Sequence, residues 1–152
     1  MIITFLGTYL VASKQADTQV RLKSAEISAA KAQSLRKEKL DSFSAFLNAS
    51  DSTWQLSNDF LVKSRTGSLG EYREESREVV TELTRSYLGV LVASSQKTRD
   101  AATKYKETLS LHLQRAAKSE WQDDTATDRK ELLDAMREEL EGDAATLGPA
   151  QK

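Results

Sequence analysis

Residues 40–61 read LDSFSAFLNASDSTWQLSNDFL and contain neither glycine nor proline. The same absence extends over residues 8–66, and residues 71–141 contain only Gly89. A β-rich domain needs turn residues about every 8–12 positions, whereas the residues that dominate here (Ala, Leu, Glu, Lys, Arg and Gln) favour helix. The sequence therefore predicts an all-α fold.

Apolar side chains recur in this stretch at alternating intervals of three and four residues, which places them on one face of a helix. A similar stripe runs through residues 80–112, with a shift after Ser94. Two long helices joined by a short turn run antiparallel, so we expect a coiled-coil-like helical hairpin with close approach at Ser and Ala positions. A break at residues 48–52 is an alternative, but the spacing continues through them. The predicted seam consists of Leu40, Phe43, Leu47, Trp54 and Leu61 in the first helix and Val80, Leu83, Tyr87 and Val90 in the second.

The turn of the hairpin is placed by glycine and by capping signals. Gly67 suits the left-handed residue that follows many helices. Ser68 and Glu71 have the S-x-x-E spacing of a capping box, in which each side chain meets an orphan amide. The first helix is therefore predicted to end near Arg65 and the second to begin near Leu69.

A second break is predicted in residues 121–127, where Asp and Thr offer several N-cap residues. We expect a short third amphipathic helix over about residues 127–141, which ends at Gly142. The predicted organisation is an apolar N-terminal stretch at 1–12, a helical hairpin domain with the third helix at 13–142, and a flexible tail at 143–152.

Residues 1–12 carry no charged side chain. Twelve residues of helix span about 18 Å, whereas the hydrocarbon core of a bilayer is about 30 Å thick, so the stretch is too short to cross a membrane unaided. Three interpretations stay open: part of a longer transmembrane helix, an apolar helix end packed in a core or an oligomer, and a signal sequence or shallow interfacial anchor. The predicted membrane-anchor residues are Ile2, Ile3, Phe5, Leu6, Tyr9, Leu10 and Val11.

Charge is distributed unevenly, although 22 basic and 23 acidic residues nearly cancel. Residues 14–40 hold seven bases and three acids, a net charge of +4, and residues 120–143 hold three bases and ten acids, a net charge of −7. Basic residues beside an apolar segment mark the cytoplasmic flank of a membrane protein. Lys14, Arg21 and Lys23 are therefore the predicted juxtamembrane residues.

The apolar start, the basic helix rich in Thr and Gln, and residues 39–54 (KLDSFSAFLNASDSTW) together resemble small membrane-anchored helical proteins of actinobacteria and their phages. The shared pattern is aromatic-x-x-Phe-Leu-x-Ala-x-Asp-x-x-Trp, and the resemblance covers residues 5–60. It implies a single N-terminal span and a cytoplasmic helical body, and it implies no activity. The chain departs from the family in its short apolar stretch, which puts the span in doubt.

Residues that could carry chemistry are scarce, because the chain has no cysteine and a single histidine, His112. Glu71, Glu75, Glu78 and Glu82 share a helical face, but ferritin-like metal sites need Glu-x-x-His pairs. These acids are interpreted as a solvated face. No glycine-rich phosphate loop or hydrolase motif is present. The sequence predicts no enzyme activity, no catalytic residue, no metal, no cofactor and no small-molecule substrate.

The predicted function is a membrane-anchored helical structural or interaction protein of unknown process, with its body on the cytoplasmic face. Nucleic acid is not expected as a partner, because the basic residues surround the helix without interleaved aromatic residues. The alternative is a soluble, cytoplasmic helical-bundle module that self-assembles, for example as a homodimer, and binds a protein partner. Trp121 lies in a predicted linker beside Asp123 and Asp124 and is the candidate partner contact.

Overall fold

The computed structural model describes the backbone of residues 3–64, 72–118, 120 and 125–146, and the side chains of residues 18–62, 75–118, 120 and 125–145. This part of the chain forms four α-helices and no strand, so the predicted all-α class is confirmed. The helices are α1 (Ile3–Ser64), α2 (Tyr72–Ala93), α3 (Gln96–Ala117) and α4 (Thr125–Thr146).

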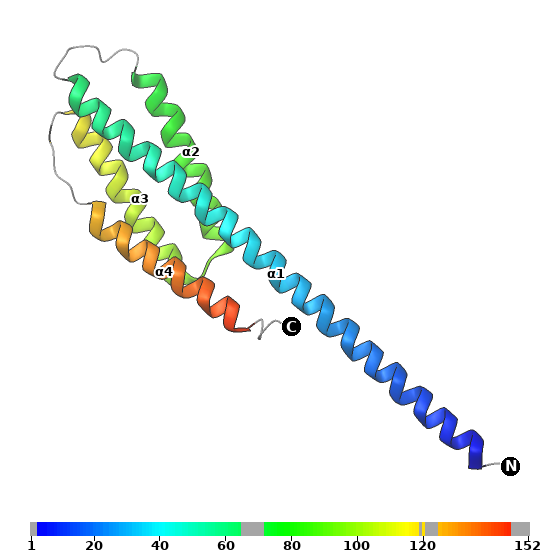
Figure 1. Ribbon diagram of the computed structural model, residues 1–152. Helices are drawn as coiled ribbons and strands as arrows, with labels where there is room; N and C mark the ends of the chain where they lie inside the picture. The colour runs from blue at the N-terminus through cyan, green and yellow to red at the C-terminus, as the bar shows by residue number, and fades with distance from the viewer. Residues whose placement is uncertain (1–2, 65–71, 119, 121–124, 147–152) are drawn as a thin grey trace.

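The helices divide into a head and a stalk (Figure 1). The head consists of residues 36–64 of α1 together with α2, α3 and α4, and the stalk is the part of α1 from residue 3 to residue 35. The described side chains of residues 18–31 are all exposed, because no other helix covers them. The predicted continuity of the first helix through residues 48–52 is confirmed.

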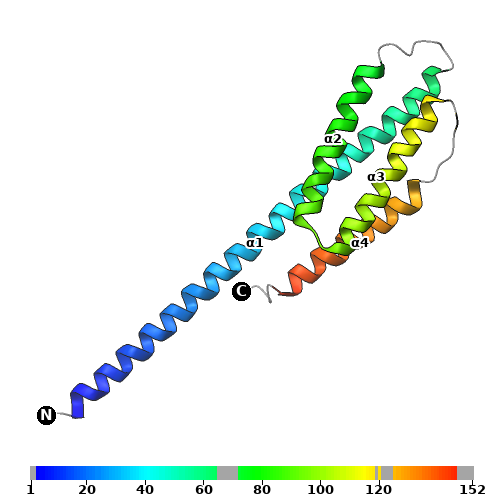
Figure 2. The ribbon, with the colours of Figure 1, turned by 180° about the vertical axis from the view of Figure 1, so that it is seen from behind.

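Within the head, α1 packs against α2 and α3, and α4 packs mainly against α3. Both views of the ribbon show that α2 and α3 run in opposite directions and meet at the end of the head from which the stalk projects (Figures 1 and 2). The end of α4 also lies near this end of the head. Three helix ends therefore converge where α1 leaves the bundle.

Phe46 of α1 lies at the centre of the main apolar core and is fully buried. Its ring meets Tyr105 of α3 edge to face, with ring centres 6.5 Å apart, and Tyr87 of α2 at 6.0 Å. Leu109 and Leu132 are also fully buried in this core, which joins all four helices. A second, smaller cluster lies toward the far end and contains Leu56, Phe60, Leu113 and Ala116.

Small polar residues fill the remaining positions on the buried face of α1. Ser50, Thr53 and Ser57 are fully buried. Their hydroxyls donate to the carbonyl oxygens of Phe46, Ala49 and Thr53 at 2.7, 2.8 and 2.9 Å, so the polar groups are satisfied within the same helix. Their small size allows neighbouring helices to approach closely.

Three of the predicted seam residues are more exposed than expected: Leu40, Trp54 and Val80 are 42%, 38% and 40% exposed. The reason is that α1 packs against both α2 and α3, so the buried face of α1 is centred on its residues Phe46 and Thr53. The other predicted seam residues lie in or against the core: Phe43, Leu83 and Val90 are buried, and Leu47, Leu61 and Tyr87 are partly buried.

Two predicted helix boundaries also change. The expected single second helix is divided at Ser94 and Ser95 into α2 and α3. The last helix, α4, continues through Gly142 to Thr146, so the predicted start of the tail at 143 lies inside a helix. The predicted turn at Gly67 and the capping box of Ser68 and Glu71 lie outside the described residues.

Replacement of Gly142 by alanine tests the course of α4. A Cβ atom at this position meets no described atom within 4 Å, and alanine is favoured over glycine inside a helix by up to about 1 kcal/mol. We expect Gly142→Ala to raise the unfolding free energy by up to about 1 kcal/mol, measured by denaturant titration. The matched control, Ala145→Gly on the exposed side of the same helix, should lower it. A loss of stability in Gly142→Ala would indicate that the helix ends at this glycine.

Candidate functional site at the junction of stalk and head

The division between α2 and α3 contains neither glycine nor proline. Ser95 is extended, with φ −67° and ψ 164°, and α3 begins at the next residue. The carbonyl oxygen of Ser94 accepts a hydrogen bond from Nε of Arg99 at 2.8 Å, and the Ser94 hydroxyl donates to the carbonyl oxygen of Val90 at 2.5 Å. The Arg99 side chain therefore satisfies a carbonyl oxygen that an unbroken helix would pair along its backbone, whereas the Val90 carbonyl oxygen also keeps its backbone bond from the N–H of Ser94 at 3.1 Å.

A carboxylate from α4 caps the start of α3. The backbone N–H of Ser95 donates to both carboxylate oxygens of Glu139, at 2.9 and 3.1 Å. The hydroxyls of Ser95 and Thr98 donate to the same carboxylate at 2.9 and 2.5 Å. A negative charge at a helix N-terminus is favourable because the first amides are unpaired and the helix dipole is positive there. Glu139 thus takes, from another helix, the role of the Glu of a capping box, whose carboxylate accepts a hydrogen bond from the backbone N–H of the N-cap residue.

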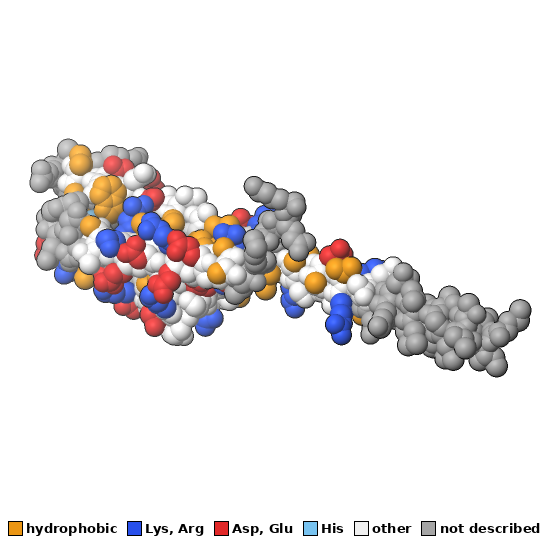
Figure 3. Space-filling view, turned by 60° about the horizontal axis from the view of Figure 1, so that its bottom comes forward, with side chains coloured by type: hydrophobic (Ala, Val, Ile, Leu, Met, Phe, Trp, Pro, Cys, Tyr) orange, Lys and Arg blue, Asp and Glu red, His pale blue; other side chains and the backbone are white. Residues whose placement is uncertain are grey.

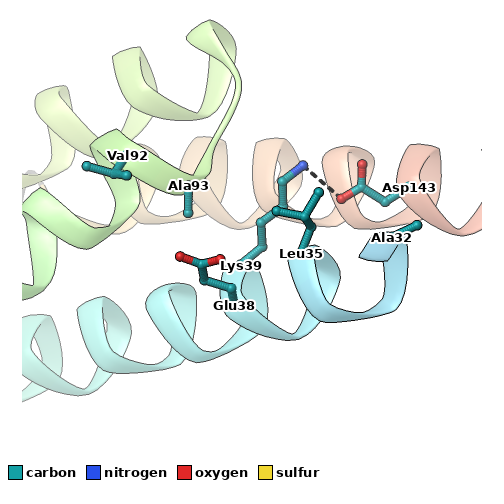
Figure 4. Close-up of a pocket in the computed structure, with 7 residues that line it drawn as sticks. All are labelled: Ala32, Leu35, Glu38, Lys39, Val92, Ala93 and Asp143. Carbon is teal, nitrogen blue, oxygen red and sulfur yellow. Dashed lines mark hydrogen bonds and ion pairs between the residues drawn. The ribbon is translucent and has the colours of Figure 1, made fainter. Parts of the chain in front are cut away.

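Lys39 of α1 completes this cluster. Its Nζ atom lies 2.9 Å from Oε1 of Glu139 and 2.8 Å from Oδ2 of Asp143, and Figure 4 shows the bond to Asp143. The side chain of Glu139 is only 7% exposed. Because the cluster joins α1, α3 and α4 at the end of α2, we call Lys39, Ser95, Thr98, Glu139 and Asp143 the junction cluster.

The junction cluster shifts the protonation equilibria of its charged groups. Burial by itself raises the pKa of the Glu139 carboxyl, but the hydrogen bonds from Thr98, Lys39 and Ser95 outweigh it and hold that pKa below its ordinary value. Burial likewise lowers the pKa of Lys39, but Asp143 and Glu139 raise it above its ordinary value. Both groups are therefore charged at neutral pH.

A hollow of about 420 Å³ lies beside the junction cluster, between the stalk and the end of α2 (Figure 4). Its walls are mostly apolar, and Leu35 and Val92 are 52% and 79% exposed. The lining residues are Ala32, Leu35, Glu38, Lys39, Val92, Ala93 and Asp143. The hollow has the volume of a small-molecule pocket, but it is open along the stalk, so it fits a helix or side chains better than an enclosed ligand.

Ion pairs between α3 and α4 occupy much of the outer surface. Lys97 pairs with Glu138, and Lys104 lies 3.0 Å from Asp128 and 2.8 Å from Glu131. Figure 3 shows such basic and acidic side chains next to each other over the head. Many acids of the predicted acidic segment are thus already paired within the head. Exposed pairs contribute little stability.

Of the predicted anchor, juxtamembrane and partner-contact residues, two have described side chains. Arg21 and Lys23 are exposed on the stalk. Trp121 lies outside the described residues, as does Ile2. The other anchor residues (Ile3, Phe5, Leu6, Tyr9, Leu10 and Val11) and Lys14 belong to α1, but their side chains lie outside the described part.

Sequence reasoning missed the junction cluster. The shift of the second stripe after Ser94 is a local sign of the break, but Glu139 lies 44 residues away from Ser95 and has no local signal.

The described residues include no group of three or more His, Asp or Glu side chains that could hold a metal ion. No helix among them is both long enough and apolar enough to span a bilayer. Comparison with protein-family models, curated proteins and solved structures found no match.

The capping role of Glu139 predicts a specific pH dependence. A carboxyl whose pKa is lowered by folding contributes stability above its unfolded pKa, about 4.5, and this contribution is lost as the pH falls through the folded value. We expect Glu139→Gln to lower the unfolding free energy at pH 7 by about 1–3 kcal/mol. The difference from the parent protein should shrink below pH 4.5 in denaturant titrations.

The control for this experiment is Glu138→Gln, which removes an exposed carboxylate paired with Lys97. It should change the unfolding free energy by less than about 1 kcal/mol. A difference between Glu139→Gln and the parent protein that stays constant between pH 7 and pH 3 would show that the charge of Glu139 contributes nothing to the cap.

Proposed function

We propose that the chain is a structural or interaction protein whose apolar N-terminal end anchors it to a membrane and whose stalk holds the helical head on the cytoplasmic side. The observation that carries this proposal is the continuity of α1 from Ile3 to Ser64. The apolar stretch and the head belong to one helix, so the head cannot move freely relative to whatever the apolar end binds.

The stalk sets the distance between the apolar N-terminal stretch and the head. Residues 13–35 separate the apolar stretch from the head and correspond to about 35 Å of helix at 1.5 Å per residue. The described side chains of residues 18–31 are exposed, as expected for a helix that serves as a spacer. A helix without packing partners is only marginally stable in water, so the head and the anchored end would stabilise it from both sides.

Apolar burial, rather than charge, would supply most of the membrane affinity. An upright stalk places Arg21 and Lys23 about 14 and 17 Å beyond residue 12, whereas the Debye length at physiological salt is about 8 Å. Basic residues near an anionic surface contribute about 1 kcal/mol each, so these two would contribute only a small fraction of that. Lys14 lies about 3 Å beyond residue 12, well within the Debye length, so it would contribute most of the roughly 1 kcal/mol that a basic residue gains near an anionic surface.

Binding to vesicles that contain phosphatidylserine tests the anchor and the upright stalk together. We expect deletion of residues 1–12 to abolish co-flotation of the protein with the vesicles. Lys14→Glu should weaken binding about tenfold, and Arg21→Glu with Lys23→Glu should weaken it only about threefold, because screening attenuates the more distant charges. Equal effects of the two charge reversals would indicate a stalk that lies along the surface.

The side of the membrane is tested in cells. The chain has no cysteine of its own, and Thr127 is exposed on α4, so Thr127→Cys provides a single label site on the head. Because basic residues favour the cytoplasmic side, we expect a membrane-impermeant maleimide to label this variant only after lysis. Labelling of intact cells would reverse the topology. Recovery of the full-length chain only in the soluble fraction would favour the alternative function, a self-assembling soluble module.

A further inference from the structure

The boundary between α2 and α3 joins two segments that local sequence alone would make one helix. Residues 71–117 contain a single glycine, Gly89, and no proline, and the break occurs six residues after it. The contacts that hold the break open come from Arg99 and from Glu139 of α4. Without these contacts, local sequence would favour one continuous helix from Tyr72 to Ala117.

A continuous helix would run along the stalk. The end of α2 already faces the stalk across the hollow lined by Leu35 and Val92 (Figure 4). A Cβ added at Gly89 would lie 3.5 Å from Oγ of Ser42, so these residues are opposite each other in the antiparallel pair of α1 and α2. In an antiparallel pair the two residue numbers have a constant sum, here 42 plus 89, or 131.

Extension of this register beyond Gly89 pairs exposed residues of α3 with exposed residues of the stalk. Asp100 falls opposite Lys31, and Leu111 falls opposite Val20, which gives one opposite-charge pair and one apolar pair. All four side chains are exposed in the observed structure. Lys31 and Val20 of the stalk are thus complementary to Asp100 and Leu111 on the outer face of α3.

In such a continuous helix, one face of α3 would point toward α1 and the other would point away from it. Asp100 and Glu107 lie 11 and 18 residues after Gly89, close to three and five whole turns at 3.6 residues per turn, so they face α1. Tyr105 and Leu109 lie 16 and 20 residues after Gly89, about half a turn away, so they point outward. In the observed head these two residues are buried in the main core.

The outward core face of α3 would need a new cover, and the surface that covers it in the observed head is the face of α1 around Phe46. Tyr105 packs against Phe46 of α1, and Leu109 belongs to the same core. A second copy that had released its own α3 and α4 would expose this surface. We propose that the chain forms an exchanged dimer in which α2 and α3 straighten into one helix and the α3–α4 pair of each copy completes the head of the other.

The exchange preserves the contacts that dominate the core and changes only those at the break. The interface between α3 and α1 is re-formed between copies, and α3 keeps α4 through the pairs of Lys97 with Glu138 and of Lys104 with Glu131. The cap of Ser95 by Glu139 is lost and is replaced by backbone hydrogen bonds. Leu35 and Val92, exposed in the single head, would lie close to the two-fold axis, where the second copy can cover them.

Crosslinking between different chains tests the exchange in the full-length protein. Arg129 of α4 lies 3.0 Å from Asp51 of α1, so cysteines at these two positions report the contact between α1 and α4. One chain carries Asp51→Cys and a second, differently tagged chain carries Arg129→Cys. The two chains are unfolded, mixed at high concentration and refolded together. We expect a short bismaleimide to join the two tags. The chain with both substitutions is the control for an intact contact. Dimers that never join the two tags would overturn the proposal, because dimers formed by the stalks alone keep this contact within each chain.

Proline at the first residue of α3 should hold the chain in the observed form, with α2 and α3 as separate helices. Ser95 already has the extended conformation that precedes proline, and proline is well tolerated as the first residue of a helix, so Gln96→Pro fits the observed head. Inside a continuous helix the same proline is disfavoured about a hundredfold. We expect Gln96→Pro to lower the dimer fraction at least tenfold in sedimentation or light-scattering measurements.

Gln96→Ala is the matched control, because it removes the same side-chain hydrogen bond to Asp100 without blocking a helix, and it should leave the dimer fraction high. Ser95→Ala removes one bond to Glu139, favours continuous helix and should raise the dimer fraction several-fold. Equal dimer fractions in Gln96→Pro and Gln96→Ala, or no dimer in Ser95→Ala, would overturn the proposal. In the exchanged dimer the two α1 helices run antiparallel, so this form competes with upright anchoring of both chains in one membrane, and its outcomes are measured in solution without vesicles.

Discussion

The carboxylate of Glu139 at the start of α3 is the contact on which the compact head depends. Residues 94–97 contain no helix breaker, and a continuous helix would carry the core face of α3 away from Phe46. Hydrogen bonds to a charged group contribute about 1.5–3 kcal/mol each, and Glu139 accepts such bonds from the backbone and hydroxyl of Ser95 and from Thr98. Together with the burial of Tyr105 and Leu109, these bonds outweigh the local preference for helix.

The same contact gives the uneven charge distribution of the sequence a structural meaning. Lys39 belongs to the basic segment, and Glu139 and Asp143 belong to the acidic one. Their side chains meet at 2.9 and 2.8 Å, where the stalk enters the head. One base of the basic segment and two acids of the acidic segment are therefore engaged with each other, and these three charges are not available to attract partners.

The properties that the sequence could predict are those that depend on neighbouring residues. The scarcity of glycine and proline predicts helix, and the spacing through residues 48–52 predicts the continuity of α1. The shift of the second stripe after Ser94 is a local sign of the break, but its cap could not be predicted, because Glu139 comes from a distant helix. The exposure of Trp54 and Leu40 could not be predicted either, since it depends on α1 having two packing partners instead of one.

The unbroken course of α1 has a consequence for the rotational phase of the molecule. In a continuous helix each residue turns the chain by about 100° and advances it by about 1.5 Å. The direction in which the head faces is therefore set by the number of residues in the stalk. Removal of seven residues would bring the head about 10 Å closer to the N-terminal end and turn it by only about 20°. Removal of two would shift it by about 3 Å and turn it by about 160°, so the length of the stalk determines which face of the head points toward a neighbour.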